Sequence, residues 1–455
     1  MRVRGRLARS GVLAIVVVSG MGLLAGVNAA APAVARVDGG AVPAGSGGSQ
    51  QWVSFYTGPG AQEDDAQAIA VARNGAAVFV TGWSTSADQV DRDYATVAYK
   101  ASTGAKMWAR RYTGVGGMGG IAQAVAVDPA GKRVFVTGYS LGQSSFTDYV
   151  TIAYNAVTGA RLWLGRYDGP GSGHDYGADV VVSPDGSRVF VTGSSRPGSP
   201  GRSDYATVAY DAATGKQLWV TRYSGPGGPN DTAYSLAVGP GGKTVYVTGR
   251  SGRDIATVAY NAATGGQLWV SRRGGGARAV TVSPDGHVVY VAGSFGLSYG
   301  TVAYNAATGT IRWQSKYSGK PGSVLGANSL AVSPSGTRLY VTGVAFPDFE
   351  TVAYDAATGA RSWARRFNGP GNSYAFAPQV AVGPHGHTVY IAGGPGRYAA
   401  TVAYNAATGA TQWVRLHRGT GTALAVDHVT GAVYVTGGVV RTASFFDYMT
   451  IAYHG

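Results

Sequence analysis

Residues 206–219 read Ala-Thr-Val-Ala-Tyr-Asp-Ala-Ala-Thr-Gly-Lys-Gln-Leu-Trp, and this stretch returns along the chain with few changes. Its TVAY or TIAY core occurs eight times, with successive copies starting 55, 56, 50, 44, 50, 50 and 49 residues apart. The copies open at Thr96, Thr151, Thr207, Thr257, Thr301, Thr351, Thr401 and Thr450. Such regular spacing predicts a repeat architecture whose differences in length fall in loops.

One complete copy contains four short runs with the composition of β-strands. They are residues 206–211, 217–223, 235–240 and 244–249, which are rich in Val, Tyr, Thr and Trp and are bounded by Gly, Pro, Asn or Asp. Gly215 supplies the positive φ that a tight turn needs. Eight copies of four antiparallel strands, with no sustained helical period after the leader, predict an all-β, eight-bladed β-propeller.

The two ends of the chain complete each other. Residues 51–60 match the Trp-bearing strand at 218–227 but follow no TVAY segment, whereas residues 447–455 contain TIAY and no Trp strand after it. We therefore predict a single domain over 51–455. In this domain an N-terminal outer strand joins three C-terminal strands to close the eighth blade, which removes the open edges that invite aggregation.

The run Ala-x-Asn/Asp-x-x-Thr-Gly-x-x-x-Trp, nearly whole at 209–219, 259–269, 353–363 and 403–413, resembles the tryptophan-docking motif of the PQQ-type (quinoprotein) propeller repeat. Segments such as AVSPDG and VYVTG also resemble the YVTN and SBBP β-propeller repeats of secreted bacterial proteins. The first resemblance implies that the repeat tryptophans pack between neighbouring blades as a structural girdle. They are Trp52, Trp108, Trp163, Trp219, Trp269, Trp313, Trp363 and Trp413.

Residues 1–35 read as a Sec-type signal peptide, followed by a flexible lead-in at 36–50. Four arginines precede an apolar run at 11–27, and Ala33-Val34-Ala35 forms an Ala-x-Ala cleavage site. We predict a secreted or cell-envelope protein without a stable membrane span after cleavage; an uncleaved anchor is the alternative. The chain has no cysteine, which excludes disulfides, thiol lipidation and thiolate metal sites.

The net charge is +14, and four leader arginines without any leader acid leave about +10 on the rest. Many of these charges stand three residues after the repeat Trp: Arg111, Arg166, Arg222, Arg272, Lys316 and Arg366. They are interpreted either as guards against edge pairing on outer strands, or as a surface that attracts anionic envelope polymers. A perimeter belt of this kind does not favour nucleic acid as a partner.

The sequence matches a few catalytic or ligand-binding motifs, but none stands in the secondary structure that its function requires. We therefore predict no catalytic residue. Residues 114–119 fit G-x-G-x-x-G but lead into a strand, and His385-Gly386-His387 occupies a hairpin turn. Quinoprotein enzymes bind PQQ with calcium, often under a vicinal disulfide. This chain cannot form that disulfide, and none of the other ligands can be assigned in it. We expect no cofactor, and PQQ with calcium is the alternative.

The departures from symmetry fall on one face. The loops after the VTG strand are long at 83–92, 139–147, 194–203 and 438–446. The loops entering the inner strands carry Asp64, Asp175 and Asp231 at equivalent positions, with Glu63, Asp65 and His174 beside them. Our hypothesis is an acidic ligand or cation site of unspecified metal at the channel mouth. The alternative is that each Asp accepts hydrogen bonds from backbone N–H groups in its own turn.

Uniform copies favour a scaffold, because an enzyme on a repeat fold breaks symmetry where its chemistry lies. We predict a secreted, monomeric, non-catalytic propeller that binds a protein or anionic envelope polymer through the loops of one face. The alternatives are a divergent quinoprotein oxidoreductase or a polysaccharide lyase or hydrolase using the channel mouth, and an assembly factor of the cell envelope.

Overall fold

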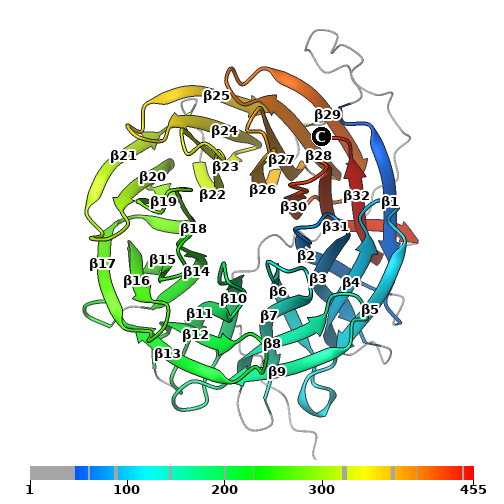
Figure 1. Ribbon diagram of the computed structural model, residues 1–455, viewed down its shortest axis with the longest axis vertical. Helices are drawn as coiled ribbons and strands as arrows, with labels where there is room; N and C mark the ends of the chain where they lie inside the picture. The colour runs from blue at the N-terminus through cyan, green and yellow to red at the C-terminus, as the bar shows by residue number, and fades with distance from the viewer. Residues whose placement is uncertain are drawn as a thin grey trace, which may run out of the picture. The chain divides into compact units, whose positions relative to one another are not determined.

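The computed structural model describes residues 47–59, 62–86, 91–142, 146–198, 201–228, 230–319, 325–369, 375–395, 397–442 and 445–455. These residues form eight four-stranded antiparallel sheets, arranged as blades around a central axis (Figure 1). The predicted eight-bladed propeller is confirmed. In the described part the single helical segment is the 3-10 turn η1 (Val115–Gly117), and no helix there has the length and apolar character to cross a membrane. The predicted signal peptide lies outside the described residues.

Each of the first seven blades uses four consecutive strands, from the central channel outward. Blade 1 contains β2 (Asp64–Val71), β3 (Ala77–Thr85), β4 (Arg92–Lys100) and β5 (Lys106–Tyr112). Blade 2 contains β6 (Gly120–Val127), β7 (Arg133–Leu141), β8 (Thr147–Asn155) and β9 (Arg161–Tyr167). Blade 3 contains β10 (Asp175–Val182), β11 (Arg188–Ser195), β12 (Asp204–Asp211) and β13 (Gln217–Tyr223). Blade 4 contains β14 (Asp231–Val238), β15 (Thr244–Ser251), β16 (Asp254–Asn261) and β17 (Gln267–Gly274).

The second half of the ring repeats this order until the last blade. Blade 5 contains β18 (Gly276–Val282), β19 (Val288–Phe295), β20 (Ser298–Asn305) and β21 (Ile311–Tyr317). Blade 6 contains β22 (Leu325–Val332), β23 (Arg338–Ala345), β24 (Asp348–Asp355) and β25 (Arg361–Phe367). Blade 7 contains β26 (Ala375–Val382), β27 (Thr388–Pro395), β28 (Tyr398–Asn405) and β29 (Thr411–Arg418). Blade 8 contains β30 (Ala423–Val426), β31 (Val433–Thr442), β32 (Phe445–Tyr453) and β1 (Gln50–Tyr56).

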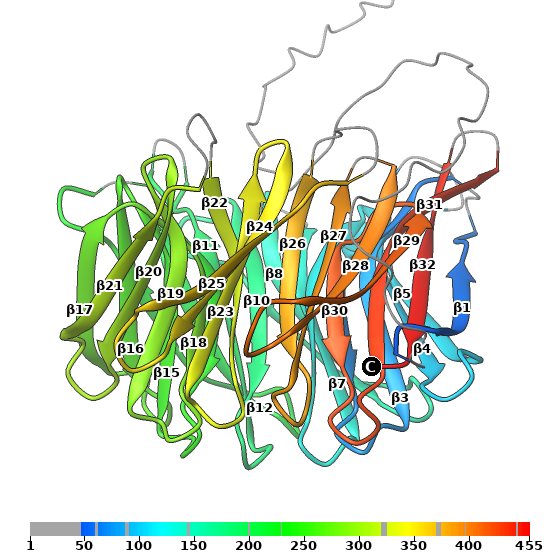
Figure 2. The same cartoon turned by 90° about the horizontal axis from the view of Figure 1, so that it is seen from above.

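The antiparallel order gives the ring two different faces, seen edge-on in Figure 2. The turn face carries the first and third connections of each blade, such as 183–187 and 212–216 in blade 3. The loop face carries the second connection of each blade and the crossover into the next blade, such as 168–174 between β9 and β10. The predicted asymmetric loops therefore share the loop face.

The ring is closed by the two ends of the chain, as predicted. Strand β1 pairs antiparallel with β32, with Trp52 opposite Ala452 and Phe55 opposite Met449. The structured ring begins before the predicted boundary at residue 51, because the Gly48 N–H donates to the His454 carbonyl at 2.6 Å. The His454 N–H donates in turn to the Ser49 carbonyl at 2.9 Å. These contacts replace the turn that joins the corresponding strands in other blades.

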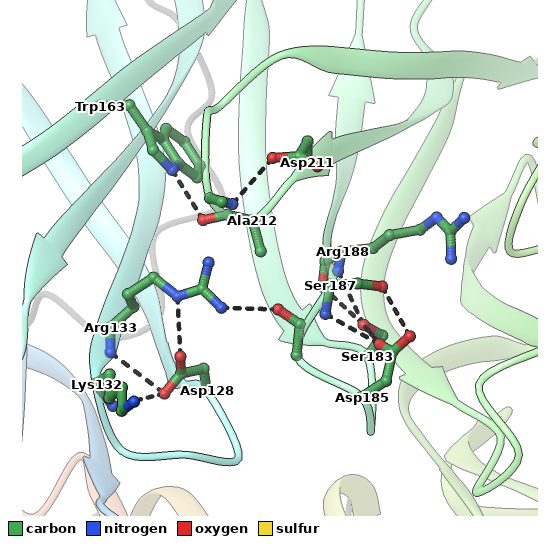
Figure 3. A network of polar contacts seen from close by, with 12 residues as sticks. Asp128, Lys132, Arg133, Trp163, Ser183, Asp185, Ser187, Arg188, Asp211 and Ala212 are labelled. Carbon is green, nitrogen blue, oxygen red and sulfur yellow. Dashed lines mark hydrogen bonds and ion pairs between the residues drawn. The ribbon is translucent and has the colours of Figure 1, made fainter.

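The repeat tryptophans join each blade to the next. Trp163 of blade 2 donates from its indole nitrogen to the Ala212 carbonyl in blade 3 at 3.1 Å (Figure 3). Its ring lies between Phe135 of its own blade and Tyr210 of the next, tilted by 38° and 36° to them. The same indole-to-carbonyl bond recurs from Trp52, Trp108, Trp219, Trp269, Trp313 and Trp363.

The glycine of the Thr-Gly turn is required by this contact. At Gly309 φ is +73°, and a Cβ there would lie 2.5 Å from Cε3 of Trp269. In blade 8, where the chain is interrupted, Gly48 takes this role: φ is +76°, and a Cβ would lie 2.5 Å from Cδ2 of Trp413. The turn glycine thus meets two demands at once, a left-handed backbone and room for an indole ring.

The outer-strand arginines take part in ion pairs that were not predicted from the sequence. Five of them form ion pairs with an aspartate of the adjoining strand in the same blade: Arg111–Asp93, Arg166–Asp148, Arg222–Asp204, Arg272–Asp254 and Arg366–Asp348. Three also donate to a tyrosine hydroxyl of the preceding blade, as Arg272 does to Tyr223 at 2.8 Å. The charge of these five arginines is therefore paired with an aspartate of the same blade.

The blades that lack the arginine mostly lack its aspartate partner as well. Blade 7 has Leu416 where the arginine stands and Tyr398 where the aspartate stands, and blade 5 has Lys316 with Ser298. In these two blades the ion pair is replaced as a unit, as expected when removing a single partner of a half-buried pair is costly. Blade 8 combines Asp447 with Phe55 and breaks this rule.

Of two other predicted loops, the structure confirms one and shows that the other is mostly strand. The glycine-rich segment at 114–119 contains η1 and runs directly into β6, so it is a loop that precedes a strand, as predicted. The segment 438–446, predicted as a long loop, is instead mostly strand, because Gly438 pairs with Tyr448 and Val440 with Phe446. Blade 8 therefore extends its hairpin on the loop face.

The docking contact predicts a difference between two glycines with the same backbone. Gly309 and Gly431 both have positive φ, but a Cβ on Gly431 meets no atom within 4 Å. Gly431→Ala should lower the free energy of unfolding by about 1 kcal/mol, the cost of the left-handed backbone alone. Gly309→Ala should cost clearly more, because it also displaces Trp269. Equal losses in urea denaturation would contradict the docking role.

Candidate functional site

The crossover from blade 2 to blade 3 departs most clearly from the repeat. It runs over residues 168–174, from the end of β9 to the start of β10. Ser172 in this segment has φ +47°, and it is the non-glycine residue with positive φ among those the structure describes. His174 forms a β-bridge with Thr147, so the crossover is held against the start of β8. This local arrangement brings three carboxylates together.

Asp148, Asp168 and Asp175 each have an oxygen within 4.8 Å of the other two. Asp148 comes from β8, Asp168 follows β9, and Asp175 begins β10, so the cluster spans two blades. Asp148 and Asp175 are buried, whereas Asp168 is exposed to solvent. Oxygen-rich groups of this kind suit hard cations such as Ca²⁺, which takes several carboxylate and carbonyl ligands.

Hydrogen bonds already engage much of this cluster. The Gly169 N–H donates to Oδ2 of Asp175 at 2.5 Å, and the Ser172 hydroxyl donates to Oδ2 of Asp168 at 3.1 Å. Asp148 forms its ion pair with Arg166. The carboxylates therefore fix the crossover backbone even without a cation.

The electrostatic environment favours a proton on Asp175. Burial raises the pKa of Asp175 to about 6; hydrogen bonds from Ser195 and the Gly169 N–H oppose this, and the nearby Asp168 and Asp148 add to it. A metal ion would act in the opposite sense, because it binds the deprotonated carboxylate.

Aromatic side chains cover one side of the crossover. His174 lies 4.6 Å from Phe146 and 5.7 Å from Tyr176 between ring centroids, and Tyr176 meets Tyr139 edge-on at 4.8 Å. Burial and the charge of Arg196 lower the pKa of His174, so its imidazole is neutral at pH 7. Nδ1 of His174 lies 3.1 Å from the Thr147 hydroxyl and 3.2 Å from the Tyr176 hydroxyl.

The other predicted acids are not part of this cluster. Asp64 begins β2 of blade 1 and Asp231 begins β14 of blade 4, and both are fully buried. Each accepts a backbone N–H of its own crossover, from Gly58 at 2.5 Å and from Gly225 at 2.6 Å. The three equivalent aspartates thus share one role, which supports the turn-capping alternative for them.

Asp65 also has a local environment of its own. It accepts a hydrogen bond from the Gln67 amide at 2.8 Å, and burial raises the pKa of Asp65 to about 6. Its neighbour Glu63 lies 3.6 Å from Arg92, whose guanidinium stacks over Trp83 at 3.9 Å. Of the predicted site residues, the sequence neighbours His174 and Asp175 lie at this crossover, whereas Asp64 and Asp65 belong to blade 1 and Asp231 to blade 4.

Sequence reasoning missed Asp148 and Asp168. Asp148 was hidden because the same repeat position holds Asp93, Asp204, Asp254 and Asp348. Asp168 carried a usable signal, since its position holds Thr57, Thr113, Ser224, Ser318 or Asn368 in five other copies. A search for acids that depart from the repeat would have found Asp168.

The raised pKa of Asp175 predicts how stability changes with pH. The native state holds a proton that the unfolded state releases near pH 4, so this group stabilises the fold at low pH and the effect is lost as pH rises through 6. Asp175→Asn keeps an acceptor for the Gly169 N–H and removes the titration. It should reduce the fall in unfolding free energy between pH 4 and 6.5 by about 2 kcal/mol.

Asp175→Ala serves as the control, because it loses the acceptor and should be less stable than the wild type at both pH values, by about 1–2 kcal/mol. Identical pH profiles for the wild type and Asp175→Asn in urea denaturation would contradict this account of the crossover.

Comparisons place the chain among known proteins. The PQQ_2 family model, described as outer membrane protein assembly factor BamB, matches residues 38–292 and, in a second overlapping match, residues 204–446. No curated protein matches the chain. The resemblance to YVTN and SBBP repeats stays a prediction.

Solved structures share the architecture at low identity. Chaetomium thermophilum Sqt1 bound to the N-terminus of ribosomal protein L10 has a TM-score of 0.61 and 15% identity, covering 89% of this chain and 100% of Sqt1. The quinohemoprotein alcohol dehydrogenase of Comamonas testosteroni has a TM-score of 0.59 and 15% identity, and the match covers 89% of this chain and 76% of the enzyme. The quinohemoprotein alcohol dehydrogenase ADHIIG of Pseudomonas putida HK5 has a TM-score of 0.55 and 14% identity, and the match covers 86% of this chain and 76% of the enzyme. These likenesses show the fold alone.

The family match spans most of the chain, and the chain therefore belongs to the PQQ_2 family, described as outer membrane protein assembly factor BamB.

Proposed function

We propose that this protein is a secreted, non-catalytic propeller that binds a partner protein through its loop face. An envelope polymer is the other partner that this face could take. Export by the predicted signal peptide at 1–35 is part of the proposal. The family description as an assembly factor, and the Sqt1 structure with a bound ribosomal-protein segment, support a protein partner by analogy.

The observation that carries the proposal is the placement of exposed large apolar side chains. Six of them lie on the second connections of blades or directly beside these connections, all on the loop face: Leu141, Phe146, Leu297, Phe346, Val440 and Phe445. Phe146 is 56% exposed and Leu297 is 66% exposed. Apolar and aromatic groups raised on loops are typical of protein interfaces, and their exposure costs solubility unless a partner covers them.

Blade 2 and the crossover that follows it place an aromatic cluster on this face. Phe146 stands beside His174, which in turn stacks with Tyr176 at an interplanar angle of 9°. These rings are held by the crossover described above, so they are presented on a fixed backbone. Aromatic groups of this kind provide contact area at a low cost in conformational entropy and are frequent among residues that dominate binding energy.

The test compares apolar residues at opposite faces of the same blade. Phe146→Asp should abolish copurification of a partner with the tagged mature protein from its native host. Val157→Asp, on the turn face and 69% exposed, should leave it unchanged. The free energies of unfolding of the two variants should match that of the wild type, since neither side chain is buried.

Two results would contradict the proposal. In the first, both variants would retain the same partners as the wild type. In the second, the purified protein would develop a quinone absorbance and reduce a dye when PQQ and Ca²⁺ are added, which would establish the oxidoreductase alternative.

A further inference from the structure

The turn face contains a cavity between blades 3 and 4 that is separate from the proposed protein-binding face. Its volume is about 410 Å³, and it is lined by the first turns of both blades and by the third connection of blade 4. The charged lining residues are Arg188, Lys243 and Asp185, and Asn261 adds an amide. The equivalent position between blades 2 and 3 provides the comparison.

Between blades 2 and 3 the arginine at this position is fully engaged. Arg133 donates from Nε to Asp128 at 2.9 Å and from Nη2 to the Gly186 carbonyl at 2.9 Å (Figure 3). Asp211 of blade 3 adds a second negative charge, and Arg133 contributes to the lowered pKa of that carboxyl, after the hydrogen bonds from Thr214. This junction is neutralised by two acids.

Between blades 3 and 4 both acids are replaced by neutral residues. Ser183 stands where Asp128 stands, and Asn261 stands where Asp211 stands. In addition, Lys243 occupies the position of Ser187. Asp185 is an added acid, because blade 2 has Ala130 at that position. Over these four positions the junction loses one negative charge net and gains one positive charge.

The backbone N–H of Arg188 donates to the Ser183 hydroxyl at 2.9 Å, but its side chain lacks the carboxylate partners of Arg133. The Nε of Arg188 is buried and makes no hydrogen bond in the described part of the chain, and Figure 3 shows its guanidinium directed away from the polar network of its own turn. A third arginine at this position, Arg338 of blade 6, reaches the Ala407 carbonyl at 3.4 Å. A buried donor without an acceptor is costly, and a bound acceptor would remove that cost.

The one carboxylate on the cavity wall is already satisfied. Asp185 accepts from the Ser183 hydroxyl at 2.5 Å, from the Ser187 N–H at 3.0 Å and from the Ser187 hydroxyl at 2.8 Å. Asn261 likewise uses Oδ1 to accept the N–H groups of Ala263 and Thr264, which leaves its amide nitrogen as a donor. Asp185 lines the same cavity, and the charge of Arg188 contributes to its lowered pKa, after the hydrogen bonds from Ser183 and Ser187. Two cations against this one carboxylate give the cavity a net positive charge.

We propose that this cavity binds a phosphate group through Arg188 and Lys243. A guanidinium presents paired donors that match an oxyanion, and a lysine adds a point charge to a phosphate. The volume exceeds that of a phosphate ion, so the site has room for the organic group that carries the phosphate, packed against Pro184 and Pro240. The site lies on the face opposite to that of the proposed function, and either can hold without the other.

The test is calorimetric titration of the full chain with inorganic phosphate at pH 7, with chloride keeping the ionic strength constant. Saturable binding at one site is expected. Arg188→Gln should weaken it at least tenfold, whereas Lys216→Gln, which removes a neighbouring charge on the same face, should leave it unchanged. The double variant Ser183→Asp with Asp185→Ala recreates the blade 2 turn at the same net charge and keeps both cations. It should also weaken binding at least tenfold, because the introduced carboxylate then occupies Arg188.

Absence of saturable binding to the wild type would overturn the proposal. Equal weakening by Lys216→Gln and Arg188→Gln would also overturn it, since this would show attraction to overall charge. Glycerol 3-phosphate distinguishes an ester from a free ion: tighter binding than inorganic phosphate is expected, and equal or weaker binding would contradict the assignment of the remaining volume to an organic group. A folded double variant that binds like the wild type would show that Arg188 is not the ligand.

Discussion

The structure depends on one repeated contact, the docking of an indole ring from each blade onto the turn glycine of the next. This contact buries a large aromatic surface between separate sheets, and it satisfies the indole N–H at a carbonyl of the next blade. Because the contact always runs in the same direction around the ring, it fixes the order and tilt of neighbouring blades. A ring of such contacts is complete only when the last blade meets the first.

The chain meets this requirement with its own ends. Trp52 on the N-terminal strand docks onto blade 1, and Gly48 receives Trp413 of blade 7 in place of the turn that blade 8 lacks. The arginine network adds a second set of links near the loop face, through pairs such as Arg222 with Tyr167. Both sets use residues that recur at fixed positions. The recurring residues therefore stabilise the ring, and a binding site is expected where the blades differ from one another.

Two places illustrate how the same geometry acquires a different local charge. At the blade 2 to blade 3 crossover, Asp168 replaces a Ser, Thr or Asn and completes a carboxylate cluster with two repeat aspartates. On the turn face, Arg188 and Lys243 line one junction, where neutral Ser183 and Asn261 stand at the positions of Asp128 and Asp211 in the preceding junction. The Nε of Arg188 makes no hydrogen bond in the described part of the chain. Each change is small in sequence, and each alters local charge because the surrounding repeat holds its neighbours in place.

The sequence was sufficient for the parts of the structure that repetition determines. The number of blades, the ring closure and the tryptophan positions follow from comparing copies, as Trp219 and Trp52 show. Contacts between strands and between blades could not be predicted from the sequence. The pairing of Arg222 with Asp204 needs the strand register, and the cluster of Asp148, Asp168 and Asp175 needs the relative position of two blades. The sequence places Asp64, Asp175 and Asp231 at equivalent positions of three blades, but it leaves open whether they form a site or accept backbone N–H groups, and that choice needed the hydrogen bonds.

The most direct measurement of the central claim removes residues 47–56 and follows unfolding of the remaining chain, with and without a synthetic peptide of those residues. The docking account predicts a lower melting temperature for the shortened chain, together with saturable binding of the peptide that restores it. A peptide in which Gly48 and Trp52 are both replaced by Ala should restore little. A shortened chain that melts like the intact protein, or one that ignores the peptide, would show that the ring does not depend on this contact.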